Sequence, residues 1–107
     1  MAIGGCKDKR TTRFLAGERV KEFQSFAEAA AKALTKLQAA GILADLRSPP
    51  SNVFEALHKD REGQHSIRIN KQWRVCFTWV PHAPVAAGTD ALQVPGDAYG
   101  VEITDYH

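Results

Sequence analysis

The sequence contains no long hydrophobic run, and no apolar stretch approaches the roughly 20 residues that a membrane-spanning helix requires. Its opening, MAIGGCKDKR, also lacks the apolar segment of a secretory signal peptide. Cysteine is scarce, with Cys6 and Cys76 alone in the chain. We therefore expect a cytoplasmic protein that does not contact a membrane and keeps both cysteines as reduced thiols.

Strong net charge is missing as well, since 14 Lys and Arg residues stand against 12 Asp and Glu residues, a net charge of +2. This small total gives little support for a nucleic-acid partner. The basic residues are nevertheless concentrated in segments 7–21 and 59–74. They are Lys7, Lys9, Arg10, Arg13, Arg19 and Lys21 in the first and Lys59, Arg61, Arg68, Lys71 and Arg74 in the second. Each segment is either a solvated surface or a binding surface, and the charge pattern leaves both open.

Histidines with the spacing of a zinc site are absent, because His58, His65 and His82 are scattered along the chain. Nothing in the sequence gives Cys76 a defined base, which argues against a cysteine nucleophile. Internal repeats are also absent, and 107 residues suffice for one domain with one core. We therefore expect a single domain over residues 1–107 that uses neither a metal nor a cofactor.

Helical patterns fill the first half of the chain. Asp8 is a candidate N-cap for a short helix that ends near Gly17. A second helix is predicted from Ser25, which has capping-box spacing to Glu28, to Gly41. Its apolar residues recur at steps of three and four: Phe26, Ala30, Ala33, Leu34, Leu37 and Ala40. Residues 2–6 favour a short strand before these helices.

Alternating patterns typical of β-strands follow the two prolines at positions 49 and 50. The predicted strands span residues 53–57, 64–70, 73–79 and 99–103. A tight turn at Asn70 and Lys71 makes the middle two antiparallel neighbours. In the last strand, Tyr99, Val101 and Ile103 are expected to point inward.

The stretch 80–95 contains several prolines and a glycine and is predicted to be a long, mobile hairpin loop. Helices followed by an antiparallel meander predict an α+β fold. In this fold, an N-terminal short strand precedes two helices that pack on one face of a mainly antiparallel sheet. The other face remains available for polar side chains.

The chain ends with Asp105, Tyr106 and His107, which continue directly from the last predicted strand. If that strand pairs with strand 73–79, the chain end lies near Arg74. An imidazole, a phenol and a guanidinium suit RNA cleavage by attack of the 2′-hydroxyl on the adjacent phosphate, which requires no metal. His107 would exchange protons, Tyr106 would relay or hydrogen-bond one, and Arg74 would hold phosphate oxygens.

The C-terminal carboxylate beside His107 favours the charged imidazole, and this biases His107 toward general acid. Structural roles remain open for the same residues. His107 can be an ordinary exposed terminus, Tyr106 can pack, and Arg74 can pair with Glu102 across strands.

Two long segments, FEALHKDREGQHSIRINKQWRVCF and GDAYGVEITDYH, resemble the HigB branch of the RelE-like toxins, which belong to type II toxin–antitoxin pairs. The resemblance covers nearly the whole chain and implies a RelE-like fold. It implies metal-independent cleavage of messenger RNA in the A site of the translating ribosome. It also implies a HigA-like helix-turn-helix antitoxin as the partner, with operator DNA contacted only indirectly through that antitoxin.

The resemblance assigns roles to individual residues. Catalytic roles are implied for His107, Tyr106, Asp105, Arg74 and His58, and RNA-binding roles for Lys59, Arg61, Arg68 and Lys71. His107 would donate a proton to the leaving oxygen, Arg74 would hold the scissile phosphate, and Tyr106 would orient or activate the attacking hydroxyl.

The sequence departs from the family pattern at three places. His58 and Lys59 replace the usual Lys-Gly pair, and Glu55 stands where some relatives have a catalytic histidine. The stretch 80–95 is longer than the usual hairpin. The departures at His58 and Glu55 motivate an alternative, in which an impaired toxin binds its antitoxin and modulates operon repression without cutting RNA. A ribosome-independent nuclease is a third hypothesis, which the small net charge disfavours.

Overall fold

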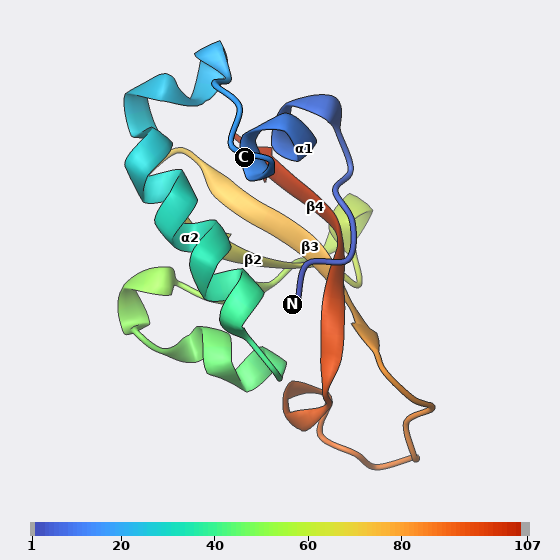
Figure 1. Cartoon of the computed structure of the whole chain (residues 1–107). Coiled ribbons are helices and arrows are strands. Elements are labelled where there is room, and N and C mark those ends of the chain that lie inside the picture. The colour runs from blue at the N-terminus through green and yellow to red at the C-terminus, as the bar shows by residue number, and fades with distance from the viewer. Residues whose placement is uncertain (1, 106–107) are drawn as a thin grey trace.

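Four antiparallel strands form the sheet of this protein, whose computed structural model describes residues 2–105 (Figure 1). The strands are β1 (Glu55–Ala56), β2 (His65–Arg68), β3 (Arg74–Pro81) and β4 (Gly96–Thr104). They lie side by side in chain order, and each pairs with the next. The predicted antiparallel meander is therefore confirmed, and its last strand lies beside β3 as expected.

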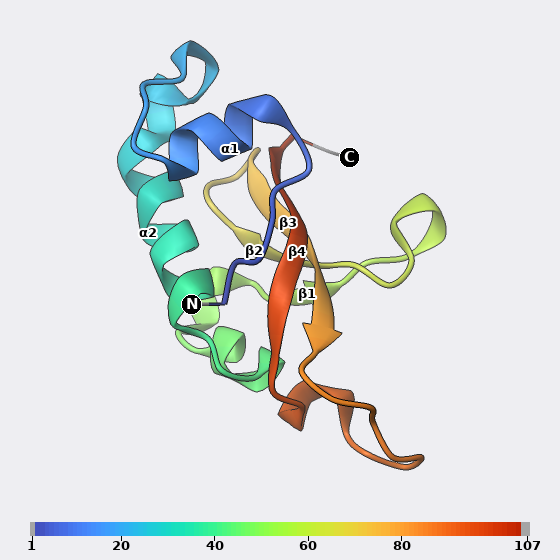
Figure 2. The ribbon, with the colours of Figure 1, turned by 45° about the vertical axis from the view of Figure 1, so that its right-hand side comes forward.

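Two helices cover one face of this sheet (Figure 2). Helix α1 spans Lys9–Leu15 and helix α2 spans Ala27–Ala39, with a 3₁₀ segment, Lys21–Phe26, between them. No helix among residues 2–105 has the length and hydropathy needed to cross a membrane. The arrangement confirms the predicted α+β class, and it leaves the opposite sheet face without either α-helix.

The hydrophobic core lies between the helices and this covered face. Ile67 and Val75 are fully buried on the sheet side, and Phe23 is fully buried on the helix side. The Phe23 ring meets Trp73 edge-on with centroids 5.8 Å apart, and Phe26 stacks on Trp73 at 4.8 Å. Burial of each large apolar side chain contributes about 1.5–3 kcal/mol, so this aromatic cluster fixes the helices on the sheet.

The start of α2 differs from the prediction. Ser25 does not form a capping box with Glu28, because Ser25 belongs to the 3₁₀ segment and Phe26 occupies the N-cap position without a side-chain capping bond. A 3₁₀ turn places residues three apart on one side, so Phe23 and Phe26 both enter the core. Burial of two aromatic rings outweighs a cap worth about 1 kcal/mol. Asp8 occupies the predicted N-cap of α1 but likewise makes no side-chain capping bond.

The N-terminal segment 2–6 runs along the outer side of β4. It forms isolated parallel bridges, from Ile3 to Ala98 and from Cys6 to Val101, instead of the predicted short strand. The intervening glycines disfavour a continuous strand. The segment therefore covers one edge of the sheet, while β1 forms the other edge.

Strand β4 contains a bulge. Cys76 pairs with Glu102, whereas Thr78 pairs with Tyr99, so β4 has one residue more than β3 between these pairs. Gly100 lies in this interval and adopts a φ of +59°, which a glycine tolerates without steric cost.

The bulge changes which side chains point inward. Val101 and Ile103 are fully buried as predicted. Tyr99 is 43% exposed, so the prediction of an inward side chain is wrong at this position. The prediction assumes strict alternation along the strand and does not include the extra residue. Residues that precede the bulge therefore lie on the sheet face opposite to the predicted one.

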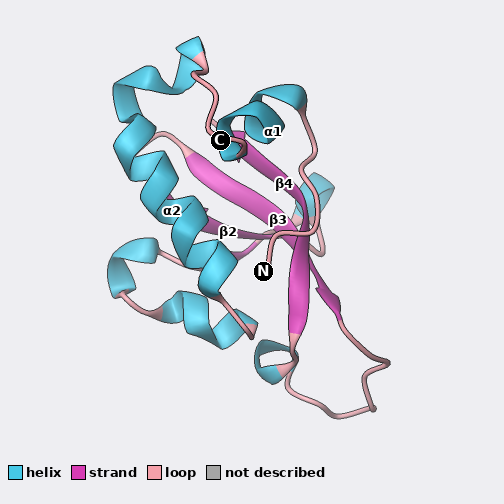
Figure 3. Ribbon diagram, in the orientation of Figure 1, coloured by secondary structure: helices cyan, strands magenta, loops and turns pink. Residues whose placement is uncertain are grey.

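Strand boundaries also differ from the prediction: β2 is shorter than 64–70, and β4 begins at Gly96 and ends at Thr104, beyond both ends of 99–103. Strand β1 is shorter than 53–57, because Val53 adopts the left-handed conformation with a φ of +45°. Strand β3 extends to Pro81, which leaves 82–95 as the connecting loop, and this loop contains a short 3₁₀ turn, Ala91–Gln93 (Figure 3). Proline is tolerated there because it lies at the end of the strand.

Candidate functional site

Polar and charged side chains gather on the sheet face opposite the helices. The cross-strand register pairs Arg68 with Arg74, Ser66 with Cys76, Cys76 with Glu102, and Arg74 with Thr104. We call this the polar face; its strand residues are Ser66, Arg68, Arg74, Cys76, Tyr99, Glu102 and Thr104. The last strand therefore places Thr104 opposite Arg74.

The guanidinium of Arg74 is held by groups from two other segments. Its Nε donates a hydrogen bond to Ser66 Oγ (2.9 Å), and its Nη2 donates to the Val53 carbonyl oxygen (2.7 Å). A Glu55 carboxylate oxygen lies 3.8 Å from the same Nη2. The Arg74 side chain is 16% exposed. These contacts fix a planar donor group at the surface, as tight binding of a phosphate requires.

The backbone that binds Arg74 is strained. Val53 combines a φ of +45° with a β-branched side chain, an arrangement that costs about 1–3 kcal/mol. Strain of this kind persists where the surrounding structure enforces it and is concentrated at functional sites. Here the strained residue directs its carbonyl oxygen at the guanidinium of Arg74.

A second cationic group surrounds Glu102. Arg61 Nη1 lies 3.2 Å from Glu102 Oε1, and Lys7 Nζ lies 3.7 Å from the same oxygen. The Arg61 Nη1 also donates to Gln64 Oε1 at 3.2 Å. The Glu102 side chain is 19% exposed and that of Lys7 is 55% exposed. The carboxylate thus holds two cations on the polar face, and the alternative pairing of Arg74 with Glu102 is not observed.

Cys76 lies fully buried beside these groups. Burial raises the pKa of the Cys76 thiol to about 11, although the charges of Arg61 and Arg74 act to lower it. The thiol therefore stays protonated near neutral pH and is not a nucleophile. Cys76 pairs with Ser66 on one side and with Glu102 on the other. Ser66 accepts a hydrogen bond from Arg74 and Glu102 accepts one from Arg61, so the two guanidinium groups lie on the same part of the polar face.

The loop between β1 and β2 carries three residues of the predicted site, which are His58, Lys59 and Arg61. It contains the 3₁₀ turn Lys59–Arg61 and projects from the sheet on the side away from α1 and α2 (Figure 2). His58 is exposed, with its Nδ1 3.6 Å from Glu62 Oε2. Lys59 is exposed and adopts a φ of +60°. The structure brings Arg61 to Glu102 on the sheet and leaves His58 and Lys59 exposed on the loop.

The predicted residues near the β2–β3 turn are placed differently from one another. Arg68 is half-buried and its Nε donates to the Asn70 carbonyl oxygen (3.1 Å), while Lys71 is exposed. Asn70 Oδ1 accepts hydrogen bonds from the backbone amides of Gln72 and Trp73, each at 2.8 Å. This geometry confirms the tight turn at Asn70 and Lys71.

The end of the chain reaches the same turn. Asp105 Oδ2 accepts a hydrogen bond from Gln72 Nε2 at 2.7 Å. Asp105 thus lies one residue beyond the Arg74–Thr104 pair and beside the β2–β3 turn. The two remaining residues of the predicted catalytic set, Tyr106 and His107, lie outside the described residues.

Several residues of the polar face are absent from the sequence prediction of the site. Glu102 and Lys7 organise the cations, and Ser66 and the Val53 carbonyl hold Arg74. Glu102 occupies a polar position of an alternating strand, a signal that the sequence does contain. The contacts of Lys7 and Val53 depend on long-range packing and leave no local pattern.

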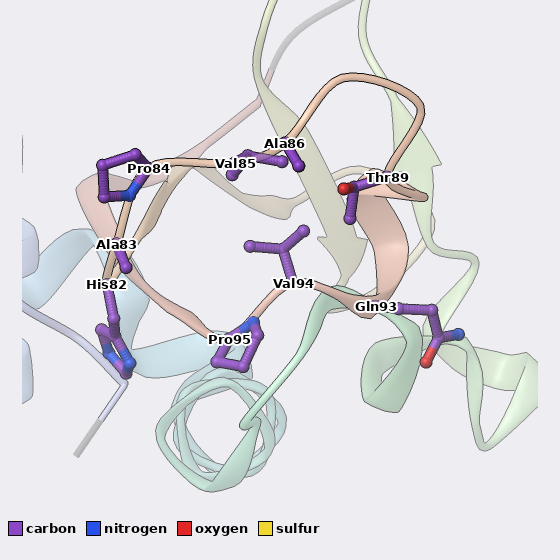
Figure 4. A pocket seen from close by; sticks show the side chains of 9 residues that line it. All are labelled: His82, Ala83, Pro84, Val85, Ala86, Thr89, Gln93, Val94 and Pro95. Atoms are coloured by element: carbon purple, nitrogen blue, oxygen red, sulfur yellow. The ribbon is translucent and has the colours of Figure 1, made fainter.

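A separate hollow lies under the loop that joins β3 and β4 (Figure 4). Its volume is about 300 Å³, and it is lined by His82, Ala83, Pro84, Val85, Ala86, Thr89, Gln93, Val94 and Pro95. These residues are mainly apolar, and His82 is paired with Asp97 at 3.1 Å. The hollow contains none of the residues of the polar face. Over residues 2–105, no group of three or more His, Cys, Asp or Glu side chains is arranged to hold a metal ion.

Comparison with known proteins relates the chain to one family of toxins. A family described as "RelE-like toxin of type II toxin-antitoxin system HigB" matches residues 5–90. The protein named Toxin HigB-1 from Vibrio cholerae serotype O1 is 40% identical over 76 residues, which is 69% of this chain and 80% of that protein. The family match over residues 5–90 includes Arg61, Arg74 and the polar-face residues of β2 and β3.

Proposed function

The chain belongs to the HigB-like family of RelE-like toxins of type II toxin–antitoxin systems, and we propose that it is an endoribonuclease that cuts messenger RNA in the A site of the translating ribosome. Membership of a type II system implies an antitoxin partner. In this proposal the partner is a HigA-like helix-turn-helix protein, which contacts operator DNA on behalf of the complex. Action on ribosomes places the toxin in the cytoplasm.

The fixed guanidinium of Arg74 is the observation that supports this function most strongly. Its bonds to Ser66 and Val53 hold it on the polar face, and its register partner Thr104 lies three residues before the end of the sequence. A scissile phosphate bound by Arg74 would therefore lie near Thr104, and the proposal assigns its cleavage to the residues that follow in the sequence, Asp105, Tyr106 and His107. Preorganised cations of this kind stabilise the charge that develops on phosphorus in the transition state.

The proposed reaction needs two proton transfers. The 2′-hydroxyl loses its proton and attacks the adjacent phosphorus, the bond from phosphorus to the 5′-oxygen breaks, and that oxygen gains a proton. The products are a 2′,3′-cyclic phosphate and a 5′-hydroxyl end. His107 donates the proton to the leaving oxygen, Tyr106 orients or activates the attacking hydroxyl and relays its proton to water, and Asp105 supports the chain end.

In this proposal the other predicted residues have two roles: four cationic residues bind RNA, and His58 takes part in proton transfer. Lys59, Arg61, Arg68 and Lys71 bind the RNA backbone, which Arg61 approaches from its site beside Glu102. His58 is the exposed imidazole of the β1–β2 loop and takes the role that a histidine at position 55 has in some relatives. The ribosome supplies much of the positioning, which accounts for the small net charge of +2.

A second candidate function is antitoxin binding without RNA cleavage. Glu55 lies 3.8 Å from Arg74 in place of a catalytic histidine, and Glu102 pairs with Arg61. Both carboxylates reduce the positive charge available to a phosphate. In this alternative the chain retains its partner and regulates its operon but does not cut RNA.

Expression without the antitoxin separates these two functions. The endoribonuclease is expected to arrest growth and to cut transcripts at fixed codon positions, and Arg74→Ala and His107→Ala are expected to abolish both effects. Each variant is also co-expressed with the antitoxin, because retained co-purification shows that it is folded. Normal growth and intact transcripts with the wild-type chain, together with antitoxin binding, would support the second function instead.

A further inference from the structure

Tyr99 is an exposed aromatic side chain on the polar face that the proposed mechanism does not use. It is 43% exposed, and the bulge at Gly100 directs it away from the core. Its register partner on β3 is Thr78, which is also exposed. The ring is thus an aromatic surface that solvent or a ligand can reach.

The ring is supported from below by the N-terminal segment. A Cβ atom at position 4 would lie 2.6 Å from Tyr99 Cε1 and 2.7 Å from its Oη, and a Cβ at position 5 would lie 3.6 Å from its Cδ1. Glycine at position 4 therefore permits the close approach, since any other side chain would push the ring away. The ring rests on the backbone of Gly4 and Gly5 while much of its surface stays open to solvent.

Three cationic side chains, Lys7, Arg61 and Arg74, lie along the polar face beyond the Tyr99 ring. Lys7 continues the segment that supports the ring, and its Nζ lies 3.7 Å from Glu102, which also holds Arg61. Arg74 lies four residues from Thr78 along β3, or about 13 Å at the usual rise of a strand. A short length of single-stranded RNA can span this distance. Proteins that bind single strands combine such a cationic track with aromatic rings on which bases stack.

The surroundings of Tyr99 favour a nucleobase over a protein partner. Its neighbours on this face include Thr78, the half-buried Asp97 and the charged Lys7, with Val80 as the exposed apolar residue. A single ring among polar groups lacks the apolar core that protein interfaces have. We propose that Tyr99 is a stacking platform for a base of the messenger RNA, separated by a short length of RNA from the phosphate that Arg74 holds. This inference rests on the proposed function, and it adds a binding subsite to it.

The test measures RNA binding separately from cleavage. Full-length protein is titrated against a fluorescent oligoribonucleotide and against ribosomes programmed with messenger RNA, both with a 2′-deoxy nucleotide at the scissile position. Tyr99→Phe keeps the ring, Tyr99→Leu removes it, and Gly4→Ala displaces it without removing it. A 4-thiouridine beside the scissile position reports contact with residue 99 by cross-linking. Antitoxin affinity and thermal stability are measured for each variant.

The platform predicts unchanged RNA affinity within about twofold for Tyr99→Phe and a loss of roughly 5- to 150-fold for Tyr99→Leu, as expected for one stacked base. Gly4→Ala is expected to weaken RNA binding in the same direction, and the cross-link to residue 99 is expected in the wild type. Wild-type RNA affinity for Tyr99→Leu, or absence of RNA binding by the wild type to both targets, would overturn the inference. A loss of antitoxin affinity with RNA affinity unchanged would overturn it too. Cleavage of the ordinary ribosome-bound messenger RNA by the wild type is scored apart, so failure of the proposed function is distinguished from failure of the platform.

Discussion

Arg61 donates a hydrogen bond to Glu102 across 41 positions of the sequence, with Nη1 and Oε1 3.2 Å apart. The two side chains are 24% and 19% exposed. This bond attaches the β1–β2 loop, which also carries His58, to the strand that leads to the end of the chain. The bond thereby joins the loop that carries His58 to β4, while the contacts of Arg74 with Val53 and Glu55 join β3 to the β1 region.

A double-mutant cycle on this pair tests its strength. We expect Arg61→Gln and Glu102→Gln each to lower the free energy of unfolding, with a coupling energy of about 1 kcal/mol, because the pair is mostly shielded from water. Urea denaturation of the wild type, the two single variants and the double variant measures this coupling energy. The exposed pair of Glu28 and Lys32, at 3.7 Å, is the matched control and should couple by less than about 0.5 kcal/mol. Equal coupling in both cycles would show that Glu102 has no special structural role.

Substitution of Arg74 should affect cleavage even when its charge is kept. Lysine cannot donate at once to Ser66 Oγ and the Val53 carbonyl in the geometry of a guanidinium. We expect Arg74→Ala to lower the single-turnover cleavage rate on programmed ribosomes by about 10²-fold or more, and Arg74→Lys by about tenfold. Ser66→Ala removes one of the two bonds and should have a smaller effect. If Arg74→Lys cleaved at the wild-type rate, charge alone would suffice and the fixed geometry would be irrelevant.

Acid should destabilise the fold through His65. The imidazole is stacked parallel to the Phe54 ring with centroids 5.4 Å apart, and burial lowers the pKa of His65 from its ordinary value of 6.5. The unfolded chain therefore binds a proton more readily than the folded one. The stabilisation from the neutral imidazole is complete above about pH 6.5 and declines as the pH falls below that value.

Thermal unfolding between pH 5 and 8 measures this effect. His65→Phe keeps an aromatic ring at the position and removes the titrating group, so we expect its stability to fall less on acidification than that of the wild type. Other histidines, such as His58 and His82, are present in both proteins and cancel in the comparison. Identical pH dependence of the two proteins would contradict the assignment to His65.

The bulge at Gly100 gives a prediction that depends on backbone conformation alone. A Cβ at this residue would meet no atom within 4 Å, but its φ of +59° disfavours other residues. Gly100→Ala is expected to lower the free energy of unfolding by about 1 kcal/mol. Gly41→Ala is the control, because a Cβ there would make an ordinary contact with Asp45 at 3.7 Å. Equal denaturation midpoints for the two variants would show that a side chain at the positive φ of residue 100 has no conformational cost.

Hydrophobic periodicity was sufficient to predict the class and the order of the elements. The positions of Ala30, Ala33, Leu34 and Leu37 define the buried side of α2, and the alternation around Val75 defines β3. Periodicity failed where one residue breaks the repeat, as at Gly100, and where tertiary burial overrides a local capping signal, as at Ser25. Such local exceptions are decided by long-range packing.

The site could be predicted in part for the same reason. Arg74 and the direction of the chain end follow from strand pairing, which alternation indicates. The partners of Arg74 do not follow from strand pairing, because the Val53 carbonyl reaches the guanidinium only through a left-handed backbone conformation. Lys7 is likewise brought to Glu102 by the parallel course of the N-terminal segment beside β4, which no pattern in residues 2–7 encodes.

Mapping the cleavage products on ribosomes programmed with a defined messenger RNA tests the central claim most directly. The wild-type chain is predicted to cut the RNA in the A-site codon and to leave a 2′,3′-cyclic phosphate and a 5′-hydroxyl, whereas folded, antitoxin-binding Arg74→Ala and His107→Ala variants leave it intact. Uncut RNA with the wild type, or equal cutting by all three proteins, would contradict an RNA-cleaving site built on Arg74 and the end of the chain.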